Sequence, residues 1–101
     1  MWIAMSDCFL SIVHKHCNEN ELLVRARRKG DIQKVFPNAT VNEYPEHDYL
    51  YAAIVPRHFV AKAIAREVAE INYPAFKSTV TDPDLHDAYM QVWSTMAGLQ
   101  S

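Results

Sequence analysis

Glycine and cysteine are nearly absent from this sequence. Only two glycines, Gly30 and Gly98, occur in 101 residues, which excludes a glycine-rich loop that cradles a phosphate with its backbone amides. The two cysteines, Cys8 and Cys17, are too few for a disulfide framework. We therefore expect the reduced thiols of a cytoplasmic protein.

A long apolar run and an excess of one charge are also missing. No stretch approaches the roughly 20 apolar residues that span a bilayer. The segment 1–13 lacks the basic start and the small-residue cleavage site of a signal peptide, so we predict no membrane partner. The formal net charge of -2 provides no general attraction to nucleic acid, and any affinity for phosphate needs a local basic patch.

The composition that remains is typical of a soluble globular domain, with 50% hydrophobic and 22% charged residues. A chain of 101 residues can bury a core without disulfides or metal. We expect a single α+β domain over residues 1–101 and no cofactor.

The stretch 49–71 organises the rest of the chain. Residues 49–55 are uncharged and rich in aromatic and β-branched types, which predicts a strand inside the sheet. Pro56 ends this strand, and apolar residues then recur at three- and four-residue spacing, which predicts an amphipathic helix over 57–72. A strand that leads directly into a helix indicates one layer of helix on one layer of sheet.

Shorter signals predict the other elements. Asp31 is the expected N-cap of a short helix, and Asp82-Pro83-Asp84 is a strong helix start. The other predicted segments are a hairpin of strands Trp2–His14 and Leu22–Arg28, a short helix Asp31–Phe36, an edge strand Asn38–Tyr44 and a last helix 83–99. Asp7 is a candidate bend or bulge within the first of these strands. The fold expected is a four-stranded, mainly antiparallel sheet with the element order ββαββαα, ferredoxin-like in a broad sense, and with the spatial strand order left open.

Short motifs are scattered along the chain. They are a tryptophan at position 2, Phe9-Leu-Ser11, Leu23-Val-Arg-Ala-Arg27, Asp48-Tyr49, Ile71-Asn-Tyr-Pro-Ala-Phe-Lys77 and Tyr89-x-x-Val-Trp93-x-x-Met96. On these motifs the whole chain resembles a family of small uncharacterised bacterial and phage-borne proteins. The resemblance implies a shared fold and no established activity, and it draws attention to the polar residues within the motifs.

The candidate site is the outward face of the predicted sheet. Arg25 and Arg27 point the same way from one strand, and Tyr49 and Tyr51 point the same way from another. Arginine can bind phosphate through two hydrogen bonds and tyrosine can stack on a base. The full set of candidate ligand- or phosphate-binding residues is Arg25, Arg27, Tyr49, Tyr51, Tyr73 and Lys77.

Two other arrangements of this face are considered, and the sequence favours the first of them. In the first, the C-terminal helix covers it, with Trp93 packed on the tyrosines and the arginines stacked on rings or paired with Asp48 and Asp84. In the second, the helix leaves a cleft that suits a small anionic ligand. Residues that would line this cleft are Arg25, Arg27, Tyr73 and Lys77.

Histidine and cysteine near the start of the chain suggest metal or nucleophile chemistry. His14, His16 and Cys17 are ligand types that zinc accepts, but no second ligand pair follows at a recognisable spacing, and a solvated loop is favoured. Cys8 in an apolar strand is typical of a small core residue. We predict neither a metal site nor a catalytic residue.

The sequence therefore favours a non-enzymatic interaction module of bacterial or phage origin. Its partner is expected to be a macromolecule, first of all another protein, which it would bind as an adaptor or inhibitor. The alternative is a domain that binds RNA or nucleotide phosphate through Arg25, Arg27 and Lys77, and a small hydrolase or nuclease is the least favoured hypothesis. A homodimer through residues 39–44 or 57–72 is a further option.

Overall fold

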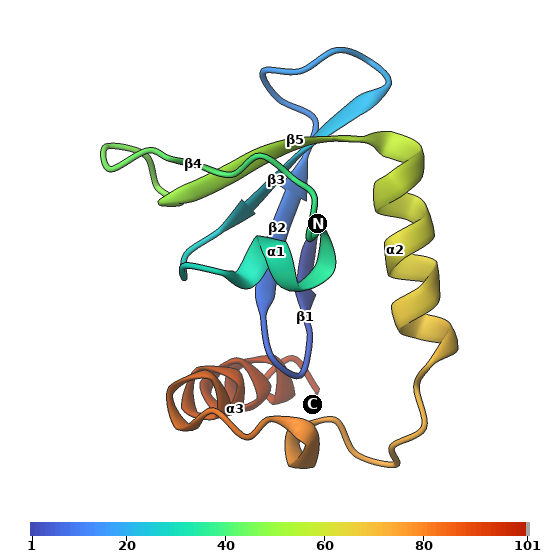
Figure 1. The fold of residues 1–101 in the computed structure, drawn as a ribbon. Helices are drawn as coiled ribbons and strands as arrows, with labels where there is room; N and C mark the ends of the chain where they lie inside the picture. Colours follow the sequence, from blue (N-terminus) through green and yellow to red (C-terminus); the bar gives the residue numbers. More distant parts are fainter. Residues whose placement is uncertain (101) are drawn as a thin grey trace.

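The computed structural model describes residues 1–100 as a five-stranded sheet with three α-helices (Figure 1). The strands are β1 (Trp2–Ala4), β2 (Phe9–Val13), β3 (Glu21–Ala26), β4 (Asn42–Glu43) and β5 (Tyr51–Pro56), in the spatial order β1-β2-β3-β5-β4. The helices are α1 (Asp31–Val35), α2 (Arg57–Ala69) and α3 (Pro83–Ala97), with a short 3-10 helix, η1 (Lys77–Thr79). The predicted α+β class is confirmed.

The sheet has a fifth strand because the segment predicted as one strand, Trp2–His14, folds into two. Ser6 and Asp7 lie in a tight turn between β1 and β2, where the Met5 N–H donates to the Cys8 carbonyl (2.9 Å). Serine and aspartate favour turns because their side chains compete for local backbone hydrogen bonds. The prediction of four strands in the order ββαββαα was therefore wrong, and the order is βββαββαα with η1 before the last helix.

The ferredoxin-like description, used in a broad sense, matches one part of the sheet and not another. β1, β2 and β3 follow one another as a meander, and each strand pair in residues 1–100 is antiparallel. β3 and β4, in contrast, are joined through α1, and β5 lies between them and is antiparallel to both. β3 and β4 therefore run parallel, as in the split βαβ unit of ferredoxin-like folds. Within the sheet, β5 pairs with strands on both sides and β4 lies at an edge, as the sequence predicted.

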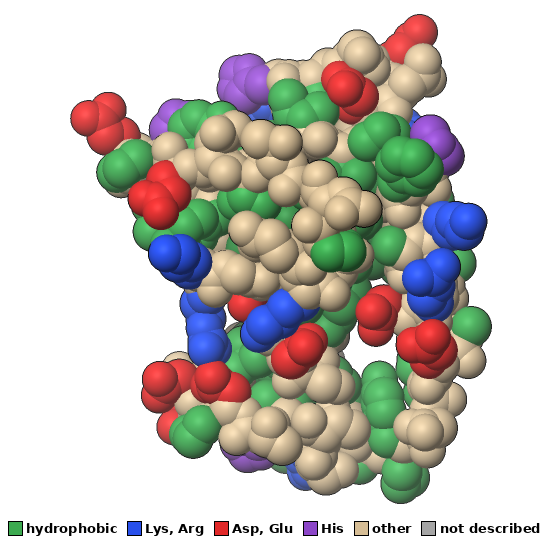
Figure 2. All heavy atoms as spheres, in the orientation of Figure 1, with side chains coloured by type: hydrophobic (Ala, Val, Ile, Leu, Met, Phe, Trp, Pro, Cys, Tyr) green, Lys and Arg blue, Asp and Glu red, His purple; other side chains and the backbone are tan. Residues whose placement is uncertain are grey.

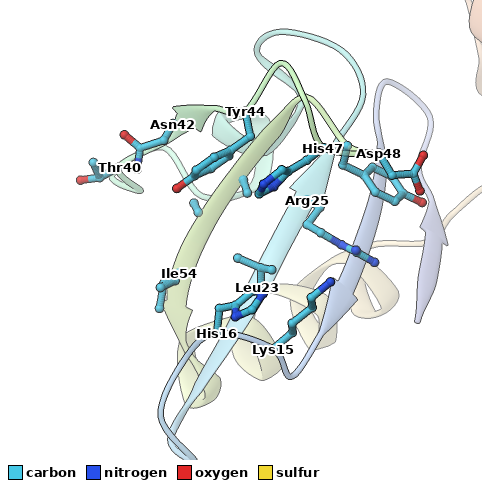
Figure 3. A pocket seen from close by; sticks show the side chains of 13 residues that line it. Lys15, His16, Leu23, Arg25, Thr40, Asn42, Tyr44, His47, Asp48 and Ile54 are labelled. Carbon is cyan, nitrogen blue, oxygen red and sulfur yellow. The ribbon is translucent and has the colours of Figure 1, made fainter.

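One face of the sheet carries the core. Every second side chain of β2, β3 and β5 points to this face, where α1 and the start of α2 cover it (Figure 1). The most deeply buried of these residues are Leu10, Val24, Ala26 and Ile32, none of which is more than 1% exposed. The opposite face, which contains Leu23, Arg25 and the 47% exposed Ile54, has no helix over it in Figure 3.

The starts of α1 and α3 differ from each other. Gly30, with φ 91°, is the N-cap of α1, because glycine adopts this left-handed conformation without strain. Asp31, the predicted cap, is instead the first helical residue; it is buried and accepts a hydrogen bond from the Phe9 N–H (3.2 Å). Asp82 caps α3 as predicted and accepts from the Leu85 N–H (3.0 Å).

The third helix lies at one end of the sheet, below the turn between β1 and β2 (Figure 1). The Tyr89 hydroxyl is within hydrogen-bond distance of the Met5 and Cys8 carbonyls (2.9 and 2.8 Å). The start of the helix is tied down by Arg28, which forms an ion pair with Asp82 (2.7 Å). None of the described helices has the length and apolar content that a membrane crossing requires.

Candidate functional site

Arg25 and Arg27 both lie over the ring of Tyr49. Their guanidinium carbons are 4.5 and 4.1 Å from the ring centroid, which is the range of cation–π contacts. Tyr49 is only 6% exposed, since the two arginine side chains cover it. The sequence correctly placed these three residues on one face of the sheet.

The two arginines differ in their partners. Arg27 donates to the backbone carbonyl of Asp48 (2.9 Å) and forms an ion pair with the carboxylate of the same residue (3.2 Å). Arg25 instead donates to the Ser11 hydroxyl (2.7 Å). Its Nε is buried, and within residues 1–100 it has no hydrogen-bond partner. The positive charge of Arg27 is therefore compensated inside the chain, whereas that of Arg25 is not.

Tyr51, Tyr73 and Lys77 lie away from this cluster. Tyr51 pairs with Ala26 and packs against the core on the other face of the sheet. The predicted alternation from Tyr49 to Tyr51 fails because β5 begins only at Tyr51 and Tyr49 lies outside the strand. The ring of Tyr73 contacts that of Phe76 (centroids 6.1 Å apart). The six predicted site residues thus form one group of three, with the other three outside it.

Lys77 belongs to the opposite end of the molecule. It begins η1, and its ammonium lies 5.2 Å from the centroid of the Trp93 ring. Trp93 itself is 58% exposed. The C-terminal helix therefore does not cover the arginine face with its aromatic residues, because the hydroxyl of Tyr89 anchors it to the turn between β1 and β2 instead.

A cavity of about 670 Å³ lies on the uncovered face of the sheet, beside Arg25 (Figure 3). The residues around it come from β3, β4, β5, the loop that follows β2 and the segments on both sides of β4. These residues are Lys15, His16, Leu23, Arg25, Thr40, Asn42, Tyr44, His47, Asp48, Tyr49, Ala52, Ala53 and Ile54. We call this space the sheet-face cavity.

The sheet-face cavity has two chemically different sides. In Figure 3, Lys15 extends from its loop toward Arg25 on one side, while Ile54 and Asn42 lie on the other. Tyr44 and His47 stack at the rim with ring centroids 5.0 Å apart and planes 9° apart. The cavity therefore combines cationic, apolar and aromatic groups, a mixture that suits an organic anion.

Sequence reasoning missed Lys15, His16, Tyr44 and His47. All four lie outside the helices and strands of the structure. Lys15 and His16 were predicted in a solvated loop, Tyr44 at the end of the edge strand, and His47 in a turn that only links two strands. A signal did exist, since polar and aromatic residues in loops at strand ends frequently form binding sites. Which loops meet, however, depends on the strand order.

The cysteine and histidine candidates have structural partners. Cys8 is fully buried, and burial raises the pKa of its thiol to about 12, so the reactive thiolate does not form near neutral pH. His14 is 3.1 Å from the Asn18 carbonyl, and Cys17 donates to the Glu21 carbonyl (3.4 Å). In the part of the chain that the structure describes, no three histidine, cysteine or acidic residues are placed to hold a metal ion.

A second hollow separates α2 from the lower part of the molecule, as Figure 2 shows. Its volume is about 420 Å³, and it lies between β1, the C-terminal half of α2 and the segment around Tyr73. Because of this gap, α2 and α3 do not cover each other. Both helices therefore keep apolar side chains exposed: Phe59, Val68, Val92, Trp93 and Met96 are 54–62% exposed.

Comparison with known proteins finds no matching family, no matching curated protein and no matching solved structure.

Proposed function

We propose that this protein is a non-enzymatic interaction module that binds another protein through the outer surface of α3. The observation that supports this is the exposure of Val92, Trp93 and Met96 on α3, at 57–58%, and of Leu99 just beyond it, at 77%. Apolar side chains gathered at this density on an exposed helix are typical of a contact surface. We call these four residues the α3 patch.

The α3 patch lies in a segment without charge. Residues 88–100 contain no Asp, Glu, Lys or Arg, although residues 91–100 are all exposed. The exposed side of α2, in contrast, carries Lys62, Arg66 and Glu67 between its apolar residues. Depletion of charge at the centre of a contact is a feature of protein–protein interfaces, so α3 is the better candidate of the two helices.

Spacing along the helix supports a helical contact. Leu85, Tyr89, Val92, Met96 and Leu99 follow one another at alternating four- and three-residue steps, the repeat of helices that pack side by side. The N-terminal part of this stripe packs within the protein, since Leu85 is only 5% exposed. The C-terminal part remains free for a partner.

The chemistry of the partner follows from that of the patch. Lys77 borders the α3 patch at the Trp93 ring, but residues 88–100 themselves provide no charge. A charged group opposite Val92, Met96 or Leu99 would therefore lose its water without gaining a counter-charge from the helix, which costs free energy. We therefore propose a partner that presents an apolar, uncharged helix or groove. Nucleic acid does not fit this surface, because the only charged residues of α3 are Asp84 and Asp87. An adaptor or inhibitor in the cytoplasm, where Cys8 and Cys17 stay reduced, is the role we propose.

The alternative function, binding of RNA or nucleotide phosphate through Arg25, Arg27 and Lys77, has weaker support as a single surface. Lys77 lies beside Trp93 on η1, and Arg27 is paired with Asp48. Only Arg25 of the three lines the sheet-face cavity. A phosphate-binding role would therefore use a different set of residues around Arg25.

Photo-crosslinking tests the proposed contact. A photoreactive phenylalanine analogue in place of Trp93 is expected to give one discrete protein adduct in cells that produce the chain. Because the contact is apolar, the yield should change little between low salt and about 0.5 M NaCl. The double variant Val92→Glu, Met96→Glu should abolish the adduct, since each carboxylate would be buried without a partner.

The matched control carries the same charges on α2. Phe59→Glu with Val68→Glu replaces two side chains that are 54% and 62% exposed and should leave the adduct unchanged. Sedimentation of the purified protein shows whether the adduct partner is a second copy. Absence of an adduct from position 93, or equal loss in both double variants, would contradict the proposal.

A further inference from the structure

The ion pairs of this protein are distributed unevenly around the sheet-face cavity. Arg27, Arg28 and Lys34 each lie within 4.0 Å of a carboxylate. Arg25 and Lys15, which both line the cavity, form no such pair in residues 1–100. Asp48 also lines the cavity, but its carboxylate is paired with Arg27. Lys15 and Arg25 therefore keep an uncompensated positive charge, which attracts an anion to this space.

Arg25 is held in a fixed position. Its guanidinium lies over the Tyr49 ring and donates to the Ser11 hydroxyl (2.7 Å), while its Nε is buried without a partner. A guanidinium fixed in this way loses little conformational entropy when it binds a ligand. The structure therefore presents a preorganised donor beside the cavity.

The loop that follows β2 brings the second cation to the same side. His16 has φ 55°, a left-handed conformation that few residues other than glycine adopt, with histidine, asparagine and aspartate as the more frequent exceptions. The turn made at this residue places Lys15 and His16 on the cavity wall, where Lys15 extends toward Arg25 (Figure 3). The backbone conformation of this loop thus forms one wall of the cavity.

The remaining wall suits an organic group. Leu23, Ala52 and the exposed Ile54 provide an apolar floor, and the Tyr44–His47 stack provides a flat aromatic rim. Asn42 adds an amide at the far side. A volume of about 670 Å³ lies in the range of small-molecule sites, roughly 300–1,000 Å³.

We propose that the sheet-face cavity binds a small phosphate monoester with a flat organic group, of the size of a nucleoside monophosphate. The phosphate would lie between Lys15 and Arg25, which can both donate charge-assisted hydrogen bonds to it. The flat group would lie on Leu23 and Ile54 beneath the Tyr44 ring, within reach of Asn42. No residue of α3 lines this cavity, so the proposal does not rest on the α3 patch.

Calorimetric titration of the full chain tests the site. The probes are the four common 5′-nucleoside monophosphates, the corresponding nucleosides and inorganic phosphate. At least one monophosphate should bind about tenfold more tightly than its nucleoside and than phosphate alone, because each half of the ligand contributes contacts. This affinity should fall as NaCl is raised from about 50 to about 300 mM.

Variants connect the binding to the two cations. Lys15→Met and Arg25→Met should each weaken binding of that monophosphate by about tenfold or more. Lys15 is an exposed loop residue, so its variant remains informative if loss of Arg25 destabilises the chain. Lys29→Met is the matched control, since Lys29 is also exposed and does not line the cavity; it should change affinity less than about twofold.

Several outcomes would overturn the proposal. One is that none of the four monophosphates binds at concentrations up to about 10 mM, because a dissociation constant above this value is too weak for a specific site. Another is equal binding of nucleoside and monophosphate, because the cations would then contribute nothing. If Lys15→Met and Lys29→Met weakened binding equally, the net charge of the protein alone would explain the affinity. Much tighter binding of a single-stranded oligonucleotide would indicate a surface that binds a nucleic-acid strand in place of a cavity for one small ligand.

Discussion

The sheet with α1 and the C-terminal helix α3 are two differently built regions of one small protein. In the first, Cys8, Leu10 and Val24 are 0% exposed, whereas in α3 only Leu85 is counted as buried. The sheet region gains its stability from apolar burial against α1 and α2. Fewer contacts fix α3, and several of them are polar, namely the Tyr89 hydroxyl, the Asp82 cap and the Arg28–Asp82 pair. The apolar contacts come from Leu85 and from the Tyr89 ring, which contacts the rings of Phe9 and Phe76.

This difference indicates where stability and recognition lie. A region with few buried contacts opens locally at a lower free energy than the core, and its exposed surface is free to change in response to a partner. The same holds on the uncovered side of the sheet, where the core behind it provides a rigid base for the cavity. The protein thus has a stable interior and two surfaces that do not contribute to it.

The largest expected effect comes from the same substitution made in both regions. Leu10→Ala removes a fully buried side chain and should lower the free energy of unfolding by about 2–5 kcal/mol. Leu99→Ala, at a position that is 77% exposed, should change it by less than about 0.5 kcal/mol. Urea unfolding followed by circular dichroism measures both. Similar losses in the two variants would show that the regions are equally buried in solution.

A smaller effect is expected at the junction of the two regions. Tyr89→Phe removes the hydroxyl that contacts the Met5 and Cys8 carbonyls, and burial of this hydroxyl also raises its pKa above the usual tyrosine value. The loss should be about 1 kcal/mol. Amide hydrogen exchange should accelerate in α3 while β2 and β3 stay protected. Uniform acceleration over the whole chain would mean that α3 and the sheet unfold as one unit.

The smallest effect concerns the pH dependence of the pair that begins α3. The hydrogen bond from Arg28 lowers the pKa of Asp82 from 3.8 to about 2. Because the folded pKa is depressed, the pair stabilises the protein above about pH 4, and this contribution is lost as the pH falls toward 2. Asp82→Asn keeps a good N-cap but removes the charge.

The measurement is the difference in urea midpoint between the wild type and Asp82→Asn. The wild type should be the more stable at pH 6, and the difference should vanish near pH 2 and shrink in high salt, because the pair is solvent-exposed. A difference that stays constant over this pH range would assign the role of Asp82 to capping alone.

Much of the local structure could be predicted from the sequence. The helix starting at Asp82-Pro83 and the uncharged strand at 51–56 follow from capping and β-propensity, which act over a few residues. A bend or bulge at Asp7 was predicted, but the division into two strands there was not, because a two-residue polar interruption within an apolar run is a weak signal. The grouping of Arg25, Arg27 and Tyr49 was predicted from alternation, whereas Tyr51 was assigned to the wrong face because the chain before β5 is irregular.

The amino-acid sequence by itself determined the elements, their amphipathic faces and the uncharged end of α3, because these depend on the order of side chains along the chain. Tertiary structure alone decided that Lys15 and Arg25 line the same cavity and that Lys77 lies outside it. It also decided that α3 lies at the end of the sheet and not across it. The reason is that strand order and helix docking depend on contacts between residues far apart in the sequence, which no local pattern encodes.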